Sequence, residues 1–208
     1  DFYNREDFNI MKCAIIMAGG KGTRMKATCP KVMCNVLFEP MISYVVDAVK
    51  EAGAEDICVI TGYKHELLEK YLAEKDGQIE TVLQEPQLGT GHAVMQAQSF
   101  IDRHLDDDII ILNGDGPLID AETINKAFDY HKNNDNSITL ISAIVDDTNG
   151  IGHIQRDENG KLLRIIEHKD ANDEEKKINE SNAGFYWFNG RDLSYALSKI
   201  TNNNAQNE

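Results

Sequence analysis

The sequence predicts an α/β fold, a three-layer Rossmann-like domain with helices on both faces of a mixed, mostly parallel central sheet. Three observations lead to this prediction. Short continuous apolar runs recur along the first half of the chain, each run is followed by glycine or Asn-Gly, and stretches with helical spacing lie between them. Strand followed by helix, repeated, is typical of parallel strands covered on both faces.

The first half of the chain supplies the expected parallel strands and their helices. Strands buried on both faces are expected at residues 13–18, 57–60 and 109–112. A helix over residues 41–52 stops at Gly53, a common C-terminal glycine, and has these apolar residues at helical spacing: Ile42, Val45, Val46 and Val49. Further helices are expected at residues 65–73, 90–100 and 121–131.

After about residue 136 the pattern changes to strands joined by polar turns. We expect strands at residues 138–145, 162–167 and 183–188, with short helices between them. We expect the chain after about residue 136 to extend the sheet as a mixed region and to form a second wall over the ligand site. No Pro- or Ser-rich linker separates the halves, so residues 11–208 are predicted to form one domain of two lobes, and residues 1–10 a flexible leader.

Composition argues against several classes of function. The 208 residues have a net charge of -14, which disfavours polynucleotide partners, and no apolar run approaches the roughly 20 residues of a membrane span. The leader has no apolar h-region. The four cysteines contain no repeated C-x-x-C, so neither a zinc site nor a disulfide framework is indicated, and a reducing cytoplasm fits best.

One segment departs from this acidity. Residues 11–38 contain no acidic residue and carry a charge of +5, which leaves -19 for the rest of the chain. The basic residues are Lys12, Lys21, Arg24, Lys26 and Lys31. A solvated basic loop is one interpretation, and a site for a small, highly charged anion is the other.

The glycine-rich loop after the first strand favours the anion site. It reads Gly-Gly-Lys-Gly-Thr-Arg at residues 19–24, where open α/β sheets bind ligands. Glycines let successive N–H groups face one concavity. A Walker A loop is excluded by Ile15 and Gly22, and the dinucleotide pattern fails at Met25, whereas a role in holding a triphosphate remains.

The motif Met-Ala-Gly-Gly-Lys-Gly-Thr-Arg-Met at residues 17–25, followed by Pro30 and Lys31, resembles the signature of the sugar-1-phosphate nucleotidyltransferases. Four later segments resemble the uridylyltransferase domain of the bacterial bifunctional enzymes that make UDP-N-acetylglucosamine: residues 84–93, 114–118, 167–171 and 201–206. The resemblance runs from about Cys13 to the last residue. It implies Mg²⁺-assisted attack of N-acetylglucosamine 1-phosphate on the α-phosphorus of UTP, with pyrophosphate leaving.

The resemblance also implies a role for individual residues. Arg24 and Lys31 match catalytic positions, Arg24 for the leaving pyrophosphate and Lys31 for the α-phosphate and nucleophile, and Asp115 matches the Mg²⁺ ligand. Gly152, Glu167 and Asn182 match sugar-binding positions. The nucleotide-binding positions are Ala18, Gly19, Gly20, Lys21, Gly22, Thr23, Gln84, Gly89 and Thr90, with the Gln84 amide reading uracil.

Spacing alone leaves simpler interpretations open for three of these side chains. Lys31 then reads as a surface lysine after a proline, and Asp115 as the start of an Asp-Gly-Pro turn. His92 is expected to pack or to cap the helix that follows, since the implied reaction needs no imidazole base.

Several positions depart from the family pattern. Gly116 replaces valine, which predicts a looser metal loop, and Asn113 stands where some relatives carry tyrosine. Around the implied sugar site, Gly-Ile-Gly-His ends at His153 in place of Gly-Tyr-Gly-Arg, and Ser-Asn-Ala-Gly in place of Ile-Asn-Thr-Gly contains Asn182. These changes weaken the assignment of the sugar more than that of UTP.

The family also has features downstream of this chain. A second metal ligand, an asparagine, and a hexapeptide-repeat acetyltransferase domain are expected beyond Glu208. Because the repeat domain forms the family's trimer, we expect a monomer or weak dimer for residues 1–208. Two alternatives remain open: the same fold with another base or acceptor, such as a cytidylyltransferase, and a module that binds nucleotide without turnover.

Overall fold

The structure is a computed structural model that describes residues 10–22, 25 and 28–200. Within these residues the main sheet has eight strands: β1 (Lys12–Met17), β4 (Asp56–Thr61), β5 (Glu80–Leu83), β6 (Asp108–Asn113), β7 (Ile138–Ile144), β8 (His153–Arg156), β9 (Leu162–Ile166) and β10 (Glu180–Asn189). A short ribbon consists of β2 (Asn35–Val36) and β3 (Glu39–Pro40). The helices are α1 (Met41–Glu51), α2 (His65–Lys75), α3 (Gly89–Gln96), α4 (Gln98–Arg103), α5 (Ala121–Asn133) and α6 (Gly190–Leu197), with 3-10 turns η3 (Lys31–Met33) and η4 (Glu175–Lys177).

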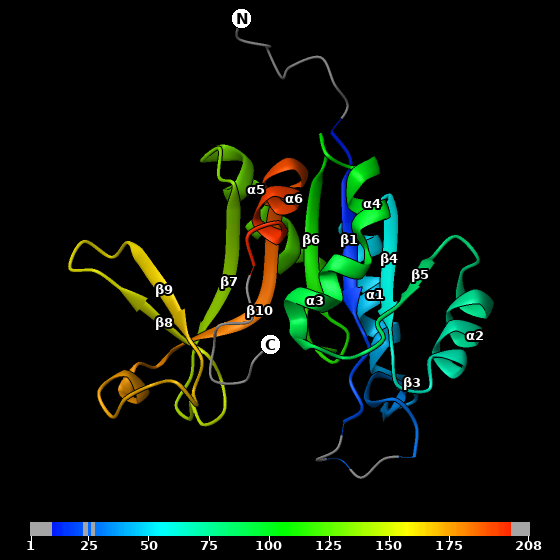
Figure 1. The fold of residues 1–208 in the computed structure, drawn as a ribbon, viewed down its shortest axis with the longest axis horizontal. Helices are drawn as coiled ribbons and strands as arrows, with labels where there is room; N and C mark the ends of the chain where they lie inside the picture. Colours follow the sequence, from blue (N-terminus) through cyan, green and yellow to red (C-terminus); the bar gives the residue numbers. More distant parts are fainter. Residues whose placement is uncertain (1–9, 23–24, 26–27, 201–208) are drawn as a thin grey trace, which may run out of the picture.

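The core of the sheet is parallel. The strands lie in the order β5-β4-β1-β6-β10-β8-β9, and β7 also pairs with β10 (Figure 1). In the middle, Ile15 of β1 lies opposite Cys58 of β4 on one side and Ile111 of β6 on the other. Pairing is parallel from β5 to β6 and antiparallel from β6 through β10 to β7, β8 and β9. The predicted α/β class, with a mixed sheet around parallel core strands, is therefore confirmed.

Helices cover both faces of the parallel strands because the side chains of β1 alternate between two cores. Ala14 and Ile16 belong to the core that α1, α2 and α5 cover, whereas Cys13 and Ile15 belong to the core under α3, α4 and α6. All four side chains are fully buried, which explains why the strand is a continuous apolar run. This layering leaves the carboxyl ends of β1 and β6 free to border a ligand site.

Trp187 of β10 fastens α5 to the sheet. Its ring is buried and packs 4.9 Å from the ring of Phe128, centroid to centroid. The indole Nε1 donates a hydrogen bond of 3.2 Å to the carbonyl oxygen of Ile124, so the ring is buried without an unpaired donor. Burial of such a side chain stabilises the fold by roughly 2–3 kcal/mol.

A buried charge lies at the start of β6. The carboxylate of Asp108 accepts a hydrogen bond of 2.8 Å from Lys132 Nζ and lies 3.6 Å from His131 Nε2. Burial opposes ionisation of Asp108, but the contacts with His131 and Lys132 outweigh it and hold the pKa of this carboxyl below its ordinary value. The charged pair therefore links α5 to the entry of β6.

Some elements differ from the sequence expectation. The single helix expected at residues 90–100 is two helices, because the backbone leaves helical geometry at Ala97, where ψ is 18°. The strand expected at residues 183–188 is the longer β10. Among the described strands of the main sheet and the α-helices, β5, β8 and α6 have no expected counterpart: β5 and β8 have only four residues each, and α6 follows β10 directly. The short elements η3, β2 and β3 were not expected either. None of the described helices is long and apolar enough to cross a membrane.

Candidate active site

A cavity of about 280 Å³ opens beside the carboxyl ends of β1 and β6. The predicted residues that line it come from four separate segments: Ala18, Gly19, Gly20, Lys31, Gln84, Gly89, Thr90 and Asp115. The fold therefore brings together most of the side chains that the resemblance assigned to nucleotide, catalysis and metal. Thr23, Arg24 and residues 201–206 lie outside the described residues.

Two glycines of the loop after β1 are required by close contacts. A Cβ atom at Gly19 would lie 3.1 Å from Gln84 Oε1 and 3.3 Å from the backbone oxygen of Thr61. Gly22 has a φ of +61°, and a Cβ atom there would lie 2.7 Å from Lys31 Cβ. The loop thus packs directly on Gln84 on one side and on the stem of Lys31 on the other. Lys21 lies instead 5.4 Å from the ring centroid of Tyr63.

Lys31 and Asp115, which both line the cavity, contact each other directly. Lys31 belongs to η3, Asp115 follows β6, and the lysine Nζ forms an ion pair with the carboxylate of Asp115. Lys31 is therefore not a free surface lysine. The chain does turn at Asp115, because Gly116 N donates to the Asn113 oxygen, and the same turn places the carboxylate in the cavity.

Asp115 suits a hard cation that phosphates help to bind. Among the described residues that line the cavity, it alone supplies a carboxylate. Mg²⁺ prefers oxygen ligands and commonly combines one or two protein carboxylates with water and substrate phosphates. The residues present fit such a shared site better than an all-protein cage.

Gln84 and Gln87 connect the loop of residues 84–89 to the glycine loop. Gln84 is 6% exposed, and its Nε2 donates to the Gly89 oxygen at 3.0 Å and lies 3.3 Å from His92 Nδ1. Gln87 donates to the Gly19 oxygen and lines the cavity, although it is absent from the predicted site. His92 packs between Gln84 and Gln96, as expected for a structural role.

The three predicted sugar-binding residues lie together where β8, β9 and β10 meet. Asn182 N donates to the Gly152 oxygen at 2.8 Å, and a Cβ atom at Gly152 would lie 3.3 Å from Glu167 Oε1. They do not line the cavity described above. Asn113 links the cavity to this cluster: it lines the cavity, and its Nδ2 donates to the oxygen of Gly184 in β10 at 3.4 Å.

Tyr186 is a polar aromatic residue beside this cluster that the sequence prediction missed. Its hydroxyl accepts a hydrogen bond from Asn182 Nδ2. Burial, followed by the nearby charge of Glu167, raises the pKa of Tyr186, so the phenol stays protonated. An available signal was the spacing, because residues 182 and 186 lie on the same face of a strand.

Two departures from the family pattern are matched by contacts nearby. A Cβ atom at Gly116 would lie 2.7 Å from Phe185 Cζ, so the phenyl ring occupies space that a valine would need, and the looser metal loop stays a prediction. His153 is buried, with Nδ1 3.0 Å from the Ile178 oxygen and Nε2 3.2 Å from His168 Nδ1. The histidine pair supports the strand that follows Gly152.

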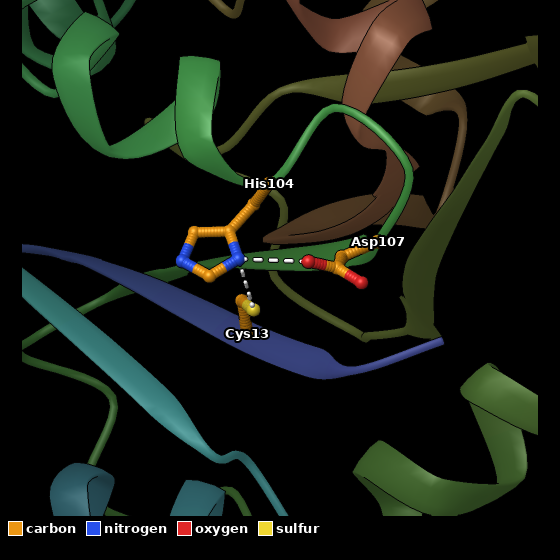
Figure 2. Close-up of side chains that lie close together, drawn as sticks. All are labelled: Cys13, His104 and Asp107. Carbon is orange, nitrogen blue, oxygen red and sulfur yellow. Dashed lines mark hydrogen bonds and ion pairs between the residues drawn. The ribbon is translucent and has the colours of Figure 1, made fainter. Parts of the chain in front are cut away.

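A second group of potential ligand atoms lies at the amino end of β1, away from the cavity (Figure 2). Nδ1 of His104 lies 3.3 Å from Cys13 Sγ and 2.8 Å from Asp107 Oδ2. Burial, and then the charge of Asp107, raises the pKa of the Cys13 thiol, so the thiol is protonated. The backbone N–H of Met11 donates to the other oxygen of Asp107. These hydrogen bonds connect β1 to the end of α4 and to the start of β6.

Comparisons with known proteins agree with the predicted resemblance. The family model described as nucleotidyl transferase matches residues 13–208. The bifunctional protein GlmU of Caldanaerobacter subterraneus subsp. tengcongensis is 43% identical over 94% of this chain and 42% of its own length. The protein of that name from Clostridioides difficile is 45% identical over 94% of this chain and 41% of its own. This chain thus spans about two fifths of the length of these relatives.

A solved structure matches the fold. The crystal structure of UDP-glucose pyrophosphorylase complexed with UDP-glucose superposes with a TM-score of 0.77 and 22% sequence identity. The superposition covers 96% of this chain and 82% of the other. The likeness therefore extends over both the parallel strands and the antiparallel half of the sheet.

Proposed function

The chain belongs to the nucleotidyl transferase family, and we propose that its reaction forms UDP-N-acetylglucosamine and pyrophosphate from UTP and N-acetylglucosamine 1-phosphate. The observation that carries this proposal is the ion pair between Lys31 and Asp115 beside the glycine loop. The ammonium group of Lys31 can neutralise a triphosphate, and the carboxylate of Asp115, which follows β6, can bind its Mg²⁺. Two relatives named bifunctional protein GlmU, 43% and 45% identical, support the assignment of the chain to this part of the family, and the choice of sugar and base rests on the motif resemblance of the sequence.

The reaction is an in-line displacement. An oxygen of the sugar 1-phosphate attacks the α-phosphorus of UTP, and the bond to pyrophosphate breaks. Little covalent help from the protein is needed, because alignment of the reactants and neutralisation of charge supply most of the catalysis. Asp115 is the residue that would hold Mg²⁺, which, when bound, neutralises charge on the phosphates.

Lys31 changes partner in this proposal. Without substrate its ammonium group neutralises Asp115. With substrate bound, the ammonium contacts the α-phosphate and the incoming nucleophile, and the carboxylate is released for the cation. Gly22 supports this exchange, because the contact of the loop with the stem of Lys31 holds the lysine Cβ while the charged end moves. Arg24 is proposed to neutralise the leaving pyrophosphate.

The loops beside β1 and β5 are proposed to bind the nucleotide. The N–H of Ala18 already donates to the Ile60 oxygen, so the backbone N–H groups of residues 19–22 are the ones proposed to bind the phosphates. Thr90, at the start of α3, lines the same cavity. Gln84, nearly buried against Gly19, presents an amide that reads the uracil edge together with the backbone of Gly89. The charge of -19 outside residues 11–38 disfavours other phosphate sites and polynucleotides.

The cluster of Gly152, Glu167 and Asn182 is proposed to bind the sugar. Glu167 supplies acceptors for hydroxyl groups, and Asn182, already oriented by Tyr186, supplies an amide for a hydroxyl or the acetamido group. A cytoplasmic location, no nucleic-acid or membrane partner, and a monomer or weak dimer for residues 1–208 belong to the same proposal.

Pyrophosphate release tests the proposal. The chain is incubated with UTP, N-acetylglucosamine 1-phosphate and Mg²⁺, alone and extended with the relatives' downstream residues, and Lys31→Ala serves as the inactive control. We expect release that requires both substrates. Competition by CTP, ATP and GTP tests the base, and glucose 1-phosphate tests the acceptor. No release from either length, together with UTP binding that is unchanged in Asp115→Asn, would instead support a module that binds nucleotide without turnover.

A further inference from the structure

Two free thiols flank Lys31. Cys29 and Cys34 are each partly exposed, and their Sγ atoms lie 3.8 Å apart. The other cysteines, Cys13 and Cys58, are fully buried in the sheet. Since a disulfide needs about 2.05 Å between its sulfurs, the first two thiols must approach by about 1.8 Å to bond.

The backbone between these thiols is already a tight turn. Met33 N donates to the Pro30 oxygen at 2.9 Å, and Cys34 N donates to the Lys31 oxygen at 3.0 Å. The residues that separate the two cysteines are therefore held in one compact conformation, and the thiols lie on the same side of it. Joining the sulfurs therefore needs side-chain rotation together with an adjustment of the backbone between residues 29 and 34, the segment that contains Lys31.

We propose that Cys29 and Cys34 are a modification site, an oxidisable dithiol that a peroxide converts to a disulfide, and that this bond lowers turnover by displacing Lys31. One thiolate attacks a peroxide oxygen, which gives a sulfenic acid and, for hydrogen peroxide, one water. The second thiol then attacks the sulfenic sulfur, the S–S bond forms, and a second water leaves. Two electrons pass from the sulfurs to the peroxide, and a reducing dithiol reverses the change.

The displacement of Lys31 follows from its position. It lies two residues after Cys29 and three before Cys34, so closure of the disulfide moves the backbone on both sides of it. The lysine has little freedom to compensate, because Gly22 packs on its Cβ and its Nζ reaches Asp115. An error of about 1 Å in placing a catalytic group can cost on the order of 10²-fold in rate. This part of the inference rests on the proposed function.

The chemical part is tested without an activity assay. Reduced protein is treated with hydrogen peroxide, blocked with an alkylating reagent and examined by mass spectrometry. We expect the loss of two hydrogen atoms, a cross-linked peptide that joins Cys29 to Cys34, and alkylation of Cys13 and Cys58 only after unfolding. Cys29→Ser and Cys34→Ser should each abolish the cross-link. Over-oxidised or unmodified thiols, under conditions that oxidise free dithiothreitol, would overturn the proposal.

The functional part compares pyrophosphate release before oxidation, after oxidation and after re-reduction. We expect at least a tenfold loss that reduction restores, and the double variant Cys29→Ser/Cys34→Ser should keep its turnover in peroxide. A disulfide without loss of turnover would refute the inhibitory role. If the reduced protein releases no pyrophosphate, the proposed function fails, and the affinity for UTP measured by calorimetry then decides whether the disulfide alters the site.

Discussion

Replacing Lys31 with methionine should change metal affinity and turnover in opposite directions. The ammonium group of Lys31 pairs with Asp115, the carboxylate proposed to hold Mg²⁺. Methionine keeps most of the side-chain length and removes the charge. The cation then has no competitor for the carboxylate of Asp115. The reacting phosphates, however, lose the positive charge proposed to stabilise their transition state.

The burial of the pair sets the size of the effect on metal binding. The two side chains are 33% and 31% exposed, so solvent screens their attraction and the pair is worth about 0.5–1 kcal/mol. Since about 1.4 kcal/mol is a factor of ten, Mg²⁺ should bind the variant roughly two to five times more tightly. Loss of a charged donor to the reacting phosphates should lower turnover by roughly 10²–10³.

Calorimetric titration with MgCl₂ in the absence of nucleotide measures the first effect, and pyrophosphate release measures the second. Lys50→Met is the matched control, because Lys50 pairs with Asp76 at similar exposure and neither residue lines the cavity. Both quantities should be unchanged there. Weaker Mg²⁺ binding by Lys31→Met would refute the reasoning, since it would mean that the lysine holds the Asp115 loop in place and does not compete for it.

Three further predictions follow from contacts described above. Gly116→Val should destabilise the fold by about 1–3 kcal/mol in urea unfolding, because Phe185 Cζ lies 2.7 Å from the new Cβ, and Gly116→Val/Phe185→Leu should recover part of this loss. Gln84→Leu should raise the KM for UTP by roughly two- to tenfold and reduce the preference for UTP over CTP, because the amide proposed to read the base, which also donates to the Gly89 oxygen, is lost. Asp108→Asn should cost stability at pH 7 and progressively less as the pH falls below the ordinary aspartate pKa of about 3.9, because the pKa of Asp108 is lowered in the folded state and its contribution is lost as the pH falls through that lowered pKa.

Each of these has a result that contradicts it. If Phe185→Leu does not relieve the cost of valine at position 116, the ring is not the obstacle. An unchanged UTP-to-CTP ratio in Gln84→Leu would remove the amide from base recognition. A destabilisation by Asp108→Asn that does not shrink as the pH is lowered from 7 through the acid range would show that packing, and not charge, accounts for it.

The parallel core of the sheet was predictable because burial on both faces leaves a continuous apolar run. Residues 13–18 and 109–112 are such runs, and the glycine or Asn-Gly that follows each one marks the end of a buried strand. The places of the glycine loop and of Asp115 at the carboxyl ends of β1 and β6 were predictable because both come soon after such strands, whereas their roles came from the resemblance and remain predictions. The ion pair between Lys31 and Asp115 was not predictable, because 84 residues separate its members.

What escaped prediction lies on a half-exposed strand and in a loop. Phe185 and Tyr186 belong to β10, and Gln87 to the loop before α3. Gln87 and Phe185 meet partners on other segments, whereas Tyr186 accepts a hydrogen bond from Asn182 of its own strand. The short strand β8 has two buried and two exposed or partly exposed residues, which gives no clear periodicity. At such positions tertiary contacts decide the structure, and local propensity decides little.

The narrow attachment of the β8–β9 hairpin lets it change during evolution independently of the parallel strands. β8 joins β10 at the bridge between Ser181 and His153, and the hairpin projects from the parallel strands (Figure 1). A hairpin attached so narrowly can accept substitutions, insertions or exchange without disturbing the pairing of β1, β4 and β6. The end proposed to bind the nucleotide is thereby constrained by its core, whereas the end proposed to bind the acceptor can diversify, and new substrate ranges should arise there first.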